Sequence, residues 1–108
     1  MKTLLIVFLL IHTLYGQAQP VERYAIVITE LMADPSPSLG LPESEYIEIR
    51  NISAKPIQLL NWRISNGKTY SLIKKDFLLQ PDSILVICPA SAEPDFQPLC
   101  SAIGLSGF

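Results

Sequence analysis

Five carboxylates in the first half of the chain are the first side chains whose types and spacing could do chemistry. They are Glu30, Asp34, Glu43, Glu45 and Glu48. A loop over 34–44 would join the two strands that carry them, so folding could gather several carboxylate oxygens, which suit Ca²⁺. Glu30, Asp34 and Glu48 are the candidate metal ligands. The calcium-loop pattern Asp-x-Asp-x-Asp-Gly is absent, so a solvated acidic edge is the favoured interpretation.

Catalysis by side chains has few other candidates in this sequence. Glu30 and Glu48 have the chemistry of a glycosidase pair, but the sequence fixes neither their separation nor a substrate cleft. The single histidine is His12, which lies in a leader described below. Its position excludes Ser-His-Asp and Cys-His catalysis and histidine-ligated zinc from the rest of the chain, and two cysteines cannot form a four-thiolate site. We therefore predict no catalytic residues and no cofactor, with Ca²⁺ as the one metal candidate.

The two cysteines, Cys88 and Cys100, flank a proline-rich stretch. In an oxidising compartment a disulfide between them could contribute about 2–3 kcal/mol. The alternative is a buried Cys88 thiol, on the face of Ile84 and Val86, with Cys100 free. The sequence leaves both alternatives open.

Two short motifs and the net charge bear on partners. Asn51-Ile52-Ser53 is a glycosylation sequon, which matters only in a eukaryotic secretory pathway. Lys74-Lys75-Asp76 is too short a basic run to indicate nucleic acid, and the chain has a formal charge of −2. We therefore expect no nucleic-acid partner.

The first residues are typical of a secretory signal peptide. Lys2 precedes an unbroken apolar run over 4–11, and Gly16-Gln17-Ala18 supplies the small residues that a signal peptidase reads. We predict cleavage after Ala18, and expect a secreted, periplasmic or cell-surface protein. The run is too short for a membrane span, so no transmembrane segment is expected after cleavage.

The remainder has the length and composition of one small β-domain. Of the 108 residues, 49% are hydrophobic, which is enough for a packed core. Residues 19–23 are expected to form a short linker before a domain over 24–108. Short apolar runs, rich in β-branched residues and separated by proline clusters at 35–42 and 89–98, predict an all-β sandwich. The predicted strands are 24–33, 45–52, 57–60, 62–65, 69–73, 77–79 and 83–88.

Alternation along these strands assigns side chains to faces. Ile47 and Ile49 should point to the core, with the intervening side chains on the other face. In the first strand, Ile26 and Ile28 share one face, and Val27 and Leu31 share the opposite face. The predicted core residues are Trp62, Ile47, Ile49, Ile64 and Val86.

Asn66-Gly67 predicts a hairpin turn, because both residues tolerate φ > 0. A two-residue turn would set Trp62 opposite Ser71. A three-residue loop with a bulge at Gly67 would instead set Trp62 opposite Tyr70 and Leu60 opposite Leu72. We favour the bulged loop, with Leu60 and Ile64 on the buried face of Trp62.

Several ordered motifs resemble the bacterial lamin-tail domain family. They are the stretches 26–38 and 40–51, then 55–65, in which a tryptophan follows a tight turn and opens a strand, and finally 79–87. The resemblance covers about residues 24–108. It implies an immunoglobulin-like antiparallel β-sandwich and carries over no catalytic residue. Asn61 stands where relatives often have glycine, and asparagine suits a left-handed turn.

The resemblance also suggests that the chain is a C-terminally incomplete fragment, because the family usually continues through two further strands. The function it implies is a non-catalytic binding or structural module of an exported bacterial protein, used for adhesion, surface assembly or as an accessory domain. The alternative is the N-terminal accessory part of a larger secreted hydrolase or nuclease. The expected partner is a protein or a surface polysaccharide.

Overall fold

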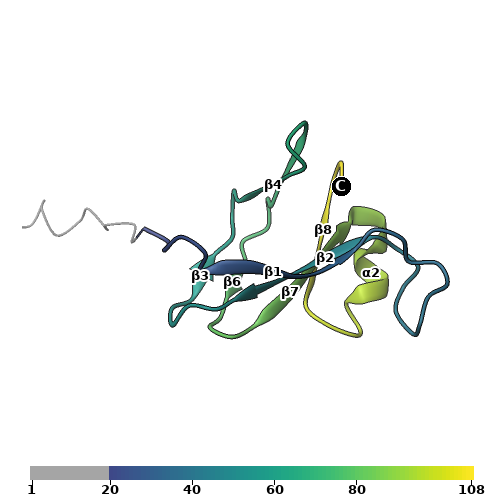
Figure 1. The fold of residues 1–108 in the computed structure, drawn as a ribbon, viewed down its shortest axis with the longest axis horizontal. Coiled ribbons are helices and arrows are strands. Elements are labelled where there is room, and N and C mark those ends of the chain that lie inside the picture. Colours follow the sequence, from purple (N-terminus) through teal and green to yellow (C-terminus); the bar gives the residue numbers. More distant parts are fainter. Residues whose placement is uncertain (1–19) are drawn as a thin grey trace, which may run out of the picture.

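A computed structural model describes residues 20–108, so the predicted leader and its cleavage site lie outside the described residues. One four-stranded sheet forms the base of the fold, in the order β1-β2-β7-β8 (Figure 1). Its strands are β1 (Ile26–Met32), β2 (Tyr46–Asn51), β7 (Ile84–Pro89) and β8 (Ala102–Leu105). The first three pair antiparallel, whereas β8 runs parallel to β7.

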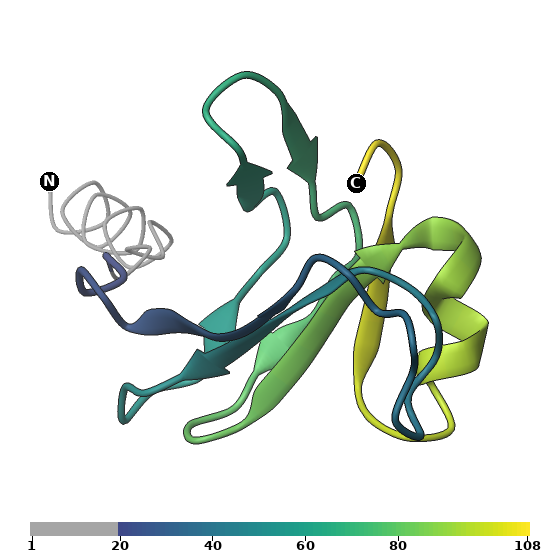
Figure 2. The same cartoon turned by 45° about the vertical axis from the view of Figure 1, so that its right-hand side comes forward.

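Two small two-stranded sheets cover one face of this base. β3 (Ile57–Gln58) pairs with β6 (Leu78–Leu79). β4 (Arg63–Ser65) pairs with β5 (Tyr70–Leu72), and together these two strands form a hairpin that projects from the base sheet (Figure 2). The prediction of an immunoglobulin-like β-sandwich is confirmed at the level of a mostly β-strand fold with several antiparallel sheets.

The main core lies between the four-stranded sheet and the two small sheets, a region that we call the inner core. Alternate residues of the base strands point into it, including Ile49, Leu85, Ile87 and Ile103, as the pleat requires. The covering segments add Ile57, Leu59, Ile73 and Leu79.

A second cluster, the outer core, lies on the opposite face of the base sheet. The chain after β7 forms a 3₁₀ turn, η1 (Ala90–Ala92), and a short helix, α2 (Glu93–Phe96). Phe96 packs there with Tyr46, Val86, Cys88, Ala92 and Ala102. The proline cluster at 89–98 was therefore not simply a loop, and the helix and β8 are elements that the predicted strands omitted.

The predicted core residues fall in both clusters and are not equally buried. Ile49 is buried in the inner core, and Val86 is buried in the outer core. Ile47, Trp62 and Ile64 are partly buried against the inner core, so Trp62 is a core residue with an exposed part rather than a fully enclosed ring.

The predicted face assignment within β1 was wrong beyond Thr29. The pairing with β2 shifts between Ile28 and Glu30, which makes Thr29 the extra residue of a β-bulge. The bulge moves Leu31 onto the face of Ile28. Both side chains are largely exposed, because β1 lies at the edge of the sheet.

The predicted bulged loop at Asn66-Gly67 was also wrong. Ser65 pairs with Tyr70 and Ile64 with Ser71, so the loop is longer than either alternative considered. Trp62 consequently lies opposite Ile73, whose N–H donates to the Trp62 carbonyl at 2.9 Å. The preceding turn places Leu59 in the core and leaves Leu60 39% exposed. Asn61 adopts a φ of 68°, the left-handed conformation expected of it.

Candidate functional site

Glu30 and Glu48 lie side by side on the outer face of the β1–β2 pair, where they are register partners. Each carboxylate accepts a hydroxyl hydrogen bond. Tyr46 Oη donates to Glu30 Oε1 at 2.8 Å, and Thr29 Oγ1 donates to Glu48 Oε1 at 2.7 Å. The pair is therefore engaged in fixing β1 against β2.

Asp34 does not share a ligand set with these two glutamates. Its carboxylate accepts the N–H of Ser36 at 3.4 Å, a local turn contact in the loop after β1. Within residues 20–108, no group of three or more His, Cys, Asp or Glu side chains is arranged to hold a metal ion. The candidate calcium ligands Glu30, Asp34 and Glu48 are thus not assembled into a site.

Tyr46 anchors the outer core beneath α2. Its ring meets Phe96 edge to face, with centroids 5.3 Å apart and planes at 71°. Burial, followed by the hydrogen bond to Glu30, raises the pKa of the Tyr46 phenol to about 12. A phenol held neutral in this way acts as a hydrogen-bond donor to the carboxylate.

Cys88 and Cys100 both lie at the outer core and are free thiols in this structure. Their sulfurs approach the carbonyls of Ile103 and Phe96, at 3.8 and 3.7 Å respectively. Burial raises the pKa of Cys88 to about 11 and also raises the pKa of Cys100. Neither thiol has the lowered pKa of a nucleophilic cysteine.

The glycosylation sequon is locked inside the fold. Asn51 is fully buried, and its Nδ2 donates to the carbonyls of Lys55 at 2.8 Å and Leu79 at 2.9 Å. Its Oδ1 accepts both the N–H and the Oγ of Ser53. The side chain holds the turn after β2 against β6, so it is closed to a glycosyl donor in the folded chain.

Glu93 is the carboxylate with the most structural contacts, and the sequence analysis missed it. Its Oε2 accepts the N–H of Gly104 at 2.6 Å, while Oε1 accepts Gln97 Nε2 at 2.8 Å and Lys75 Nζ at 3.2 Å. The Gly104 N–H, more than any other group, lowers the pKa of Glu93. The sequence signal for it was Glu93-Pro94-Asp95, since proline and acidic residues favour a first helical turn.

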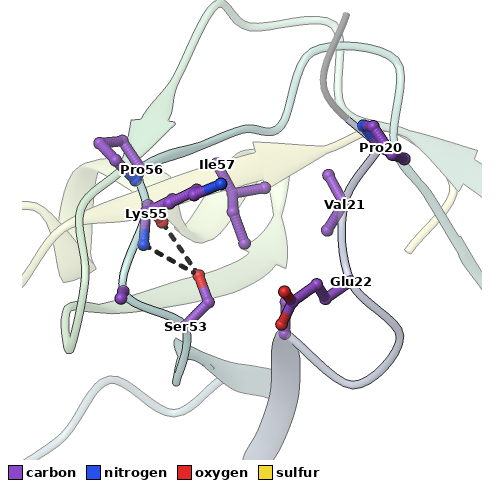
Figure 3. A pocket seen from close by; sticks show the side chains of 9 residues that line it. Pro20, Val21, Glu22, Ser53, Lys55, Pro56 and Ile57 are labelled. Atoms are coloured by element: carbon purple, nitrogen blue, oxygen red, sulfur yellow. Dashed lines mark hydrogen bonds between the residues drawn. The ribbon is translucent and has the colours of Figure 1, made fainter.

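One concave surface lies where the described chain begins (Figure 3). It has a volume of about 340 Å³, with Pro20, Val21 and Glu22 on one wall and the turn Ser53–Ile57 on the other. The Ser53 Oγ fixes that turn by accepting the Lys55 N–H at 3.3 Å, and it lies 3.0 Å from the Lys55 carbonyl oxygen. The lining holds no cysteine or histidine and a single carboxylate, Glu22.

A second concave surface, of about 510 Å³, lies between β5 and β8. Lys74, Lys75, Tyr70 and Ser71 contribute to one wall, and Gly104 and Ser106 contribute to the other. At one end the Ser71 hydroxyl bridges to the carbonyls of Ser106 and Gly107, at 3.0 and 2.9 Å.

Comparison with known protein families matches residues 20–105 to the Lamin Tail Domain. Searches among curated proteins and among solved structures return no match. The family match covers most of the chain and extends through β8.

Proposed function

This chain belongs to the lamin tail domain family, and we propose that it serves as a non-catalytic binding or structural module of an exported protein. Its roles would be adhesion, surface assembly or support of a partner domain. A reaction centre needs a group held ready for substrate, typically with a strongly perturbed pKa in a cleft.

The observation that carries the proposal is that the conspicuous ionisable groups are engaged in hydrogen bonds that hold the fold together. Glu30, Glu48 and Glu93 each accept a bond that ties one element to another. Among the described residues, every buried side-chain nitrogen or oxygen has a hydrogen-bond partner. This pattern is that of a scaffold, and it leaves the concave surfaces and strand edges as the places for a partner.

Export is supported by the sequence over 1–18, with its charged start, apolar run and small residues before Gln19. Within residues 20–108, the structure contains no helix long and apolar enough to cross a membrane.

Expression of the full chain in a bacterial host tests the export part of the proposal. The expected result is a periplasmic or extracellular product whose first residue is Gln19. Leu9→Lys, which interrupts the apolar run, should leave the protein uncleaved in the cytoplasm, while the matched control Thr13→Lys should reduce processing much less. Unprocessed wild-type protein in the cytoplasm would contradict export.

The absence of catalysis is tested separately on the processed protein. We expect no turnover of chromogenic glycosides, esters, casein or DNA above the rate of a blank. Hydrolysis by the wild type that disappears in the Glu30→Gln, Glu48→Gln double variant, with folding unchanged, would overturn this part.

A further inference from the structure

Apolar side chains on the inner face of the base sheet stay exposed along its β1 edge. Ile28 is 65% exposed and Leu31 is 68% exposed. They pair with Ile49 and Ile47 of β2, which point toward the inner core, so both lie on the inner face. The two small sheets therefore leave this edge uncovered, and neighbouring exposed apolar side chains of this kind mark an interaction surface.

One carboxylate flanks these side chains on the same face. Glu45 directly precedes β2 and lines a cavity of about 180 Å³ together with Ile47 and Ile64. It is exposed and forms no ion pair within residues 20–108. We call Ile28, Leu31 and Glu45 the β1 surface, which combines an apolar strip with an unneutralised negative charge.

The β4–β5 hairpin carries a surface of the opposite charge. The hairpin projects from the base sheet (Figure 2), and Tyr70 is 59% exposed. Strand pairing puts Arg63 on the same face of the hairpin, and its Cζ is 5.3 Å from the centroid of the Tyr70 ring. The guanidinium has no carboxylate partner in the described part of the chain. We call Arg63 and Tyr70 the hairpin surface.

Charge is segregated between the two segments that carry these surfaces. Residues 30–48 contain five carboxylates and no lysine or arginine, whereas residues 60–75 contain four cations and no carboxylate. The net charge of the chain is only −2, so two copies meet little overall repulsion while their opposite segments attract. The complement of each surface is therefore present on the same chain.

Direct pairing of two β1 edges would not use this complementarity. The bulge at Thr29 interrupts the pairing of β1, and a bulge of this kind protects an edge strand from the addition of another strand. Edge-to-edge pairing would also bring two acidic segments together. The hairpin of a second copy instead offers an aromatic ring to the apolar strip and a cation to the carboxylate.

We propose that the protein self-associates through these surfaces, with Tyr70 of one copy packed on Ile28 and Leu31 of another, and Arg63 paired with Glu45. This inference rests on the proposed binding or structural role and names its partner as a second copy of the chain. A closed two-fold pair and an open row of copies would both use this contact. The contact is small, so association should be weak and dependent on concentration.

Sedimentation of the processed protein at increasing concentration, combined with a charge swap, tests the proposal. The wild type should associate below about 1 mM. Arg63→Glu and Glu45→Arg should each remain monomeric there, because each variant places like charges across the contact. An equimolar mixture of the two variants should associate again, because every contact between unlike copies then joins a cation to a carboxylate.

Matched variants elsewhere separate this contact from a general effect of charge. Arg23 also lies over a tyrosine, with its Cζ 5.2 Å from the Tyr24 ring centroid, and Asp95 is an exposed carboxylate on α2. Arg23→Glu and Asp95→Arg should each change the association constant by less than about twofold, because exposed charges are screened. Leu31→Ala should weaken association about tenfold, whereas Leu99→Ala, at a position 57% exposed, should not.

Three results would each overturn the proposal. They are a wild type that stays monomeric up to about 1 mM, unchanged association of Arg63→Glu or Glu45→Arg, and a mixture of these two variants that stays monomeric. All the substituted side chains are exposed, and unchanged melting temperatures would verify folding. Leader processing and the absence of turnover are measured separately, so self-association can fail while the proposed function holds.

Discussion

The two faces of the base sheet are packed by different means. The inner face is covered by residues of four short strands and the turns between them, and its core includes Leu59, Leu85 and Ile87. The outer face is covered by η1 and α2 over β7, β8 and the Tyr46 end of β2, while Glu30 and Glu48 lie farther along the β1–β2 pair. Two aromatic rings, Phe96 and Tyr46, meet edge to face in the outer core.

A small sheet can thus bury part of its second face when a short segment folds back over it. Gly104 makes this possible, because a Cβ there would lie 2.7 Å from the Ala90 Cα. Glu93 then bonds the helix to β8 through the Gly104 N–H. Packing and a polar contact therefore meet at one backbone position, and substitutions at Phe96, Gly104 and Glu93 can separate their contributions.

The largest expected effect is at Phe96, which is 1% exposed. Phe96→Ala should lower the free energy of unfolding by about 4 kcal/mol, through lost burial and the cavity left beside Tyr46. Leu99→Ala, on the same segment but 57% exposed, is the control and should cost less than about 0.5 kcal/mol. Chemical denaturation measures both, and a Phe96→Ala cost near that of the control would show that the outer face has no true core.

The inner core is tested by two adjacent leucines. Leu59 is fully buried and Leu60 is 39% exposed. Leu59→Ala should therefore lower the free energy of unfolding by about 3 kcal/mol, and Leu60→Ala should lower it by less than about 1 kcal/mol. Equal losses, or the reverse order, would contradict the turn that the structure places before Trp62.

The sequence predicted the inner core better than the outer core, for a physical reason. Alternation in β2 placed Ile47 and Ile49 on one face, and the structure agrees, because a two-residue period is intrinsic to a strand. Errors arose where one residue changes the period. The bulge at Thr29 placed Leu31 on the opposite face from the one predicted, and the four-residue loop before Tyr70 changed the cross-strand partner of Trp62.

The outer core depends on elements without a periodic signature. α2 has four residues and β8 has four, too short for a hydrophobic period to stand out. The parallel pairing of β8 with β7 is a long-range contact that composition does not encode. Glu30 and Glu48 could be paired from the strand pattern, but the bonds of Glu93 to β8 could not.

Gly104→Ala is expected to have an intermediate effect. The added methyl group would meet the Ala90 Cα at 2.7 Å and Glu93 Oε2 at 2.9 Å, so η1 or β8 must shift, at a cost of about 2 kcal/mol. Ser101→Ala, an exposed change just before β8, is the control. If Gly104→Ala left the melting temperature unchanged, η1 and α2 would not be packed closely against the sheet.

Glu93→Gln removes the negative charge while keeping the side-chain shape, and should lower the free energy of unfolding by about 1 kcal/mol at neutral pH. The fold lowers the pKa of Glu93 from its ordinary value of 4.5. Its stabilisation is therefore complete above that value and is lost as the pH falls through the folded pKa. The stability difference between wild type and variant should shrink below about pH 4.5. Asp95→Asn, an exposed position two residues along the same helix, should not reproduce this pH dependence.

The smallest expected effect is on the rate at which the two cysteines react, and it tests how well α2 shields the outer core from solvent. The thiolate is the reactive form, and burial raises the pKa of Cys88 to about 11. Native alkylation by iodoacetamide should therefore modify the half-buried Cys100 first and Cys88 slowly, with two thiols counted after unfolding without reductant. Phe96→Ala should accelerate the modification of Cys88, because the ring that closes the outer core is gone, whereas Leu60→Ala should not. A protein that takes up no reagent after unfolding would carry the alternative disulfide, and equal native rates at both cysteines would show that the helix does not shield the outer face.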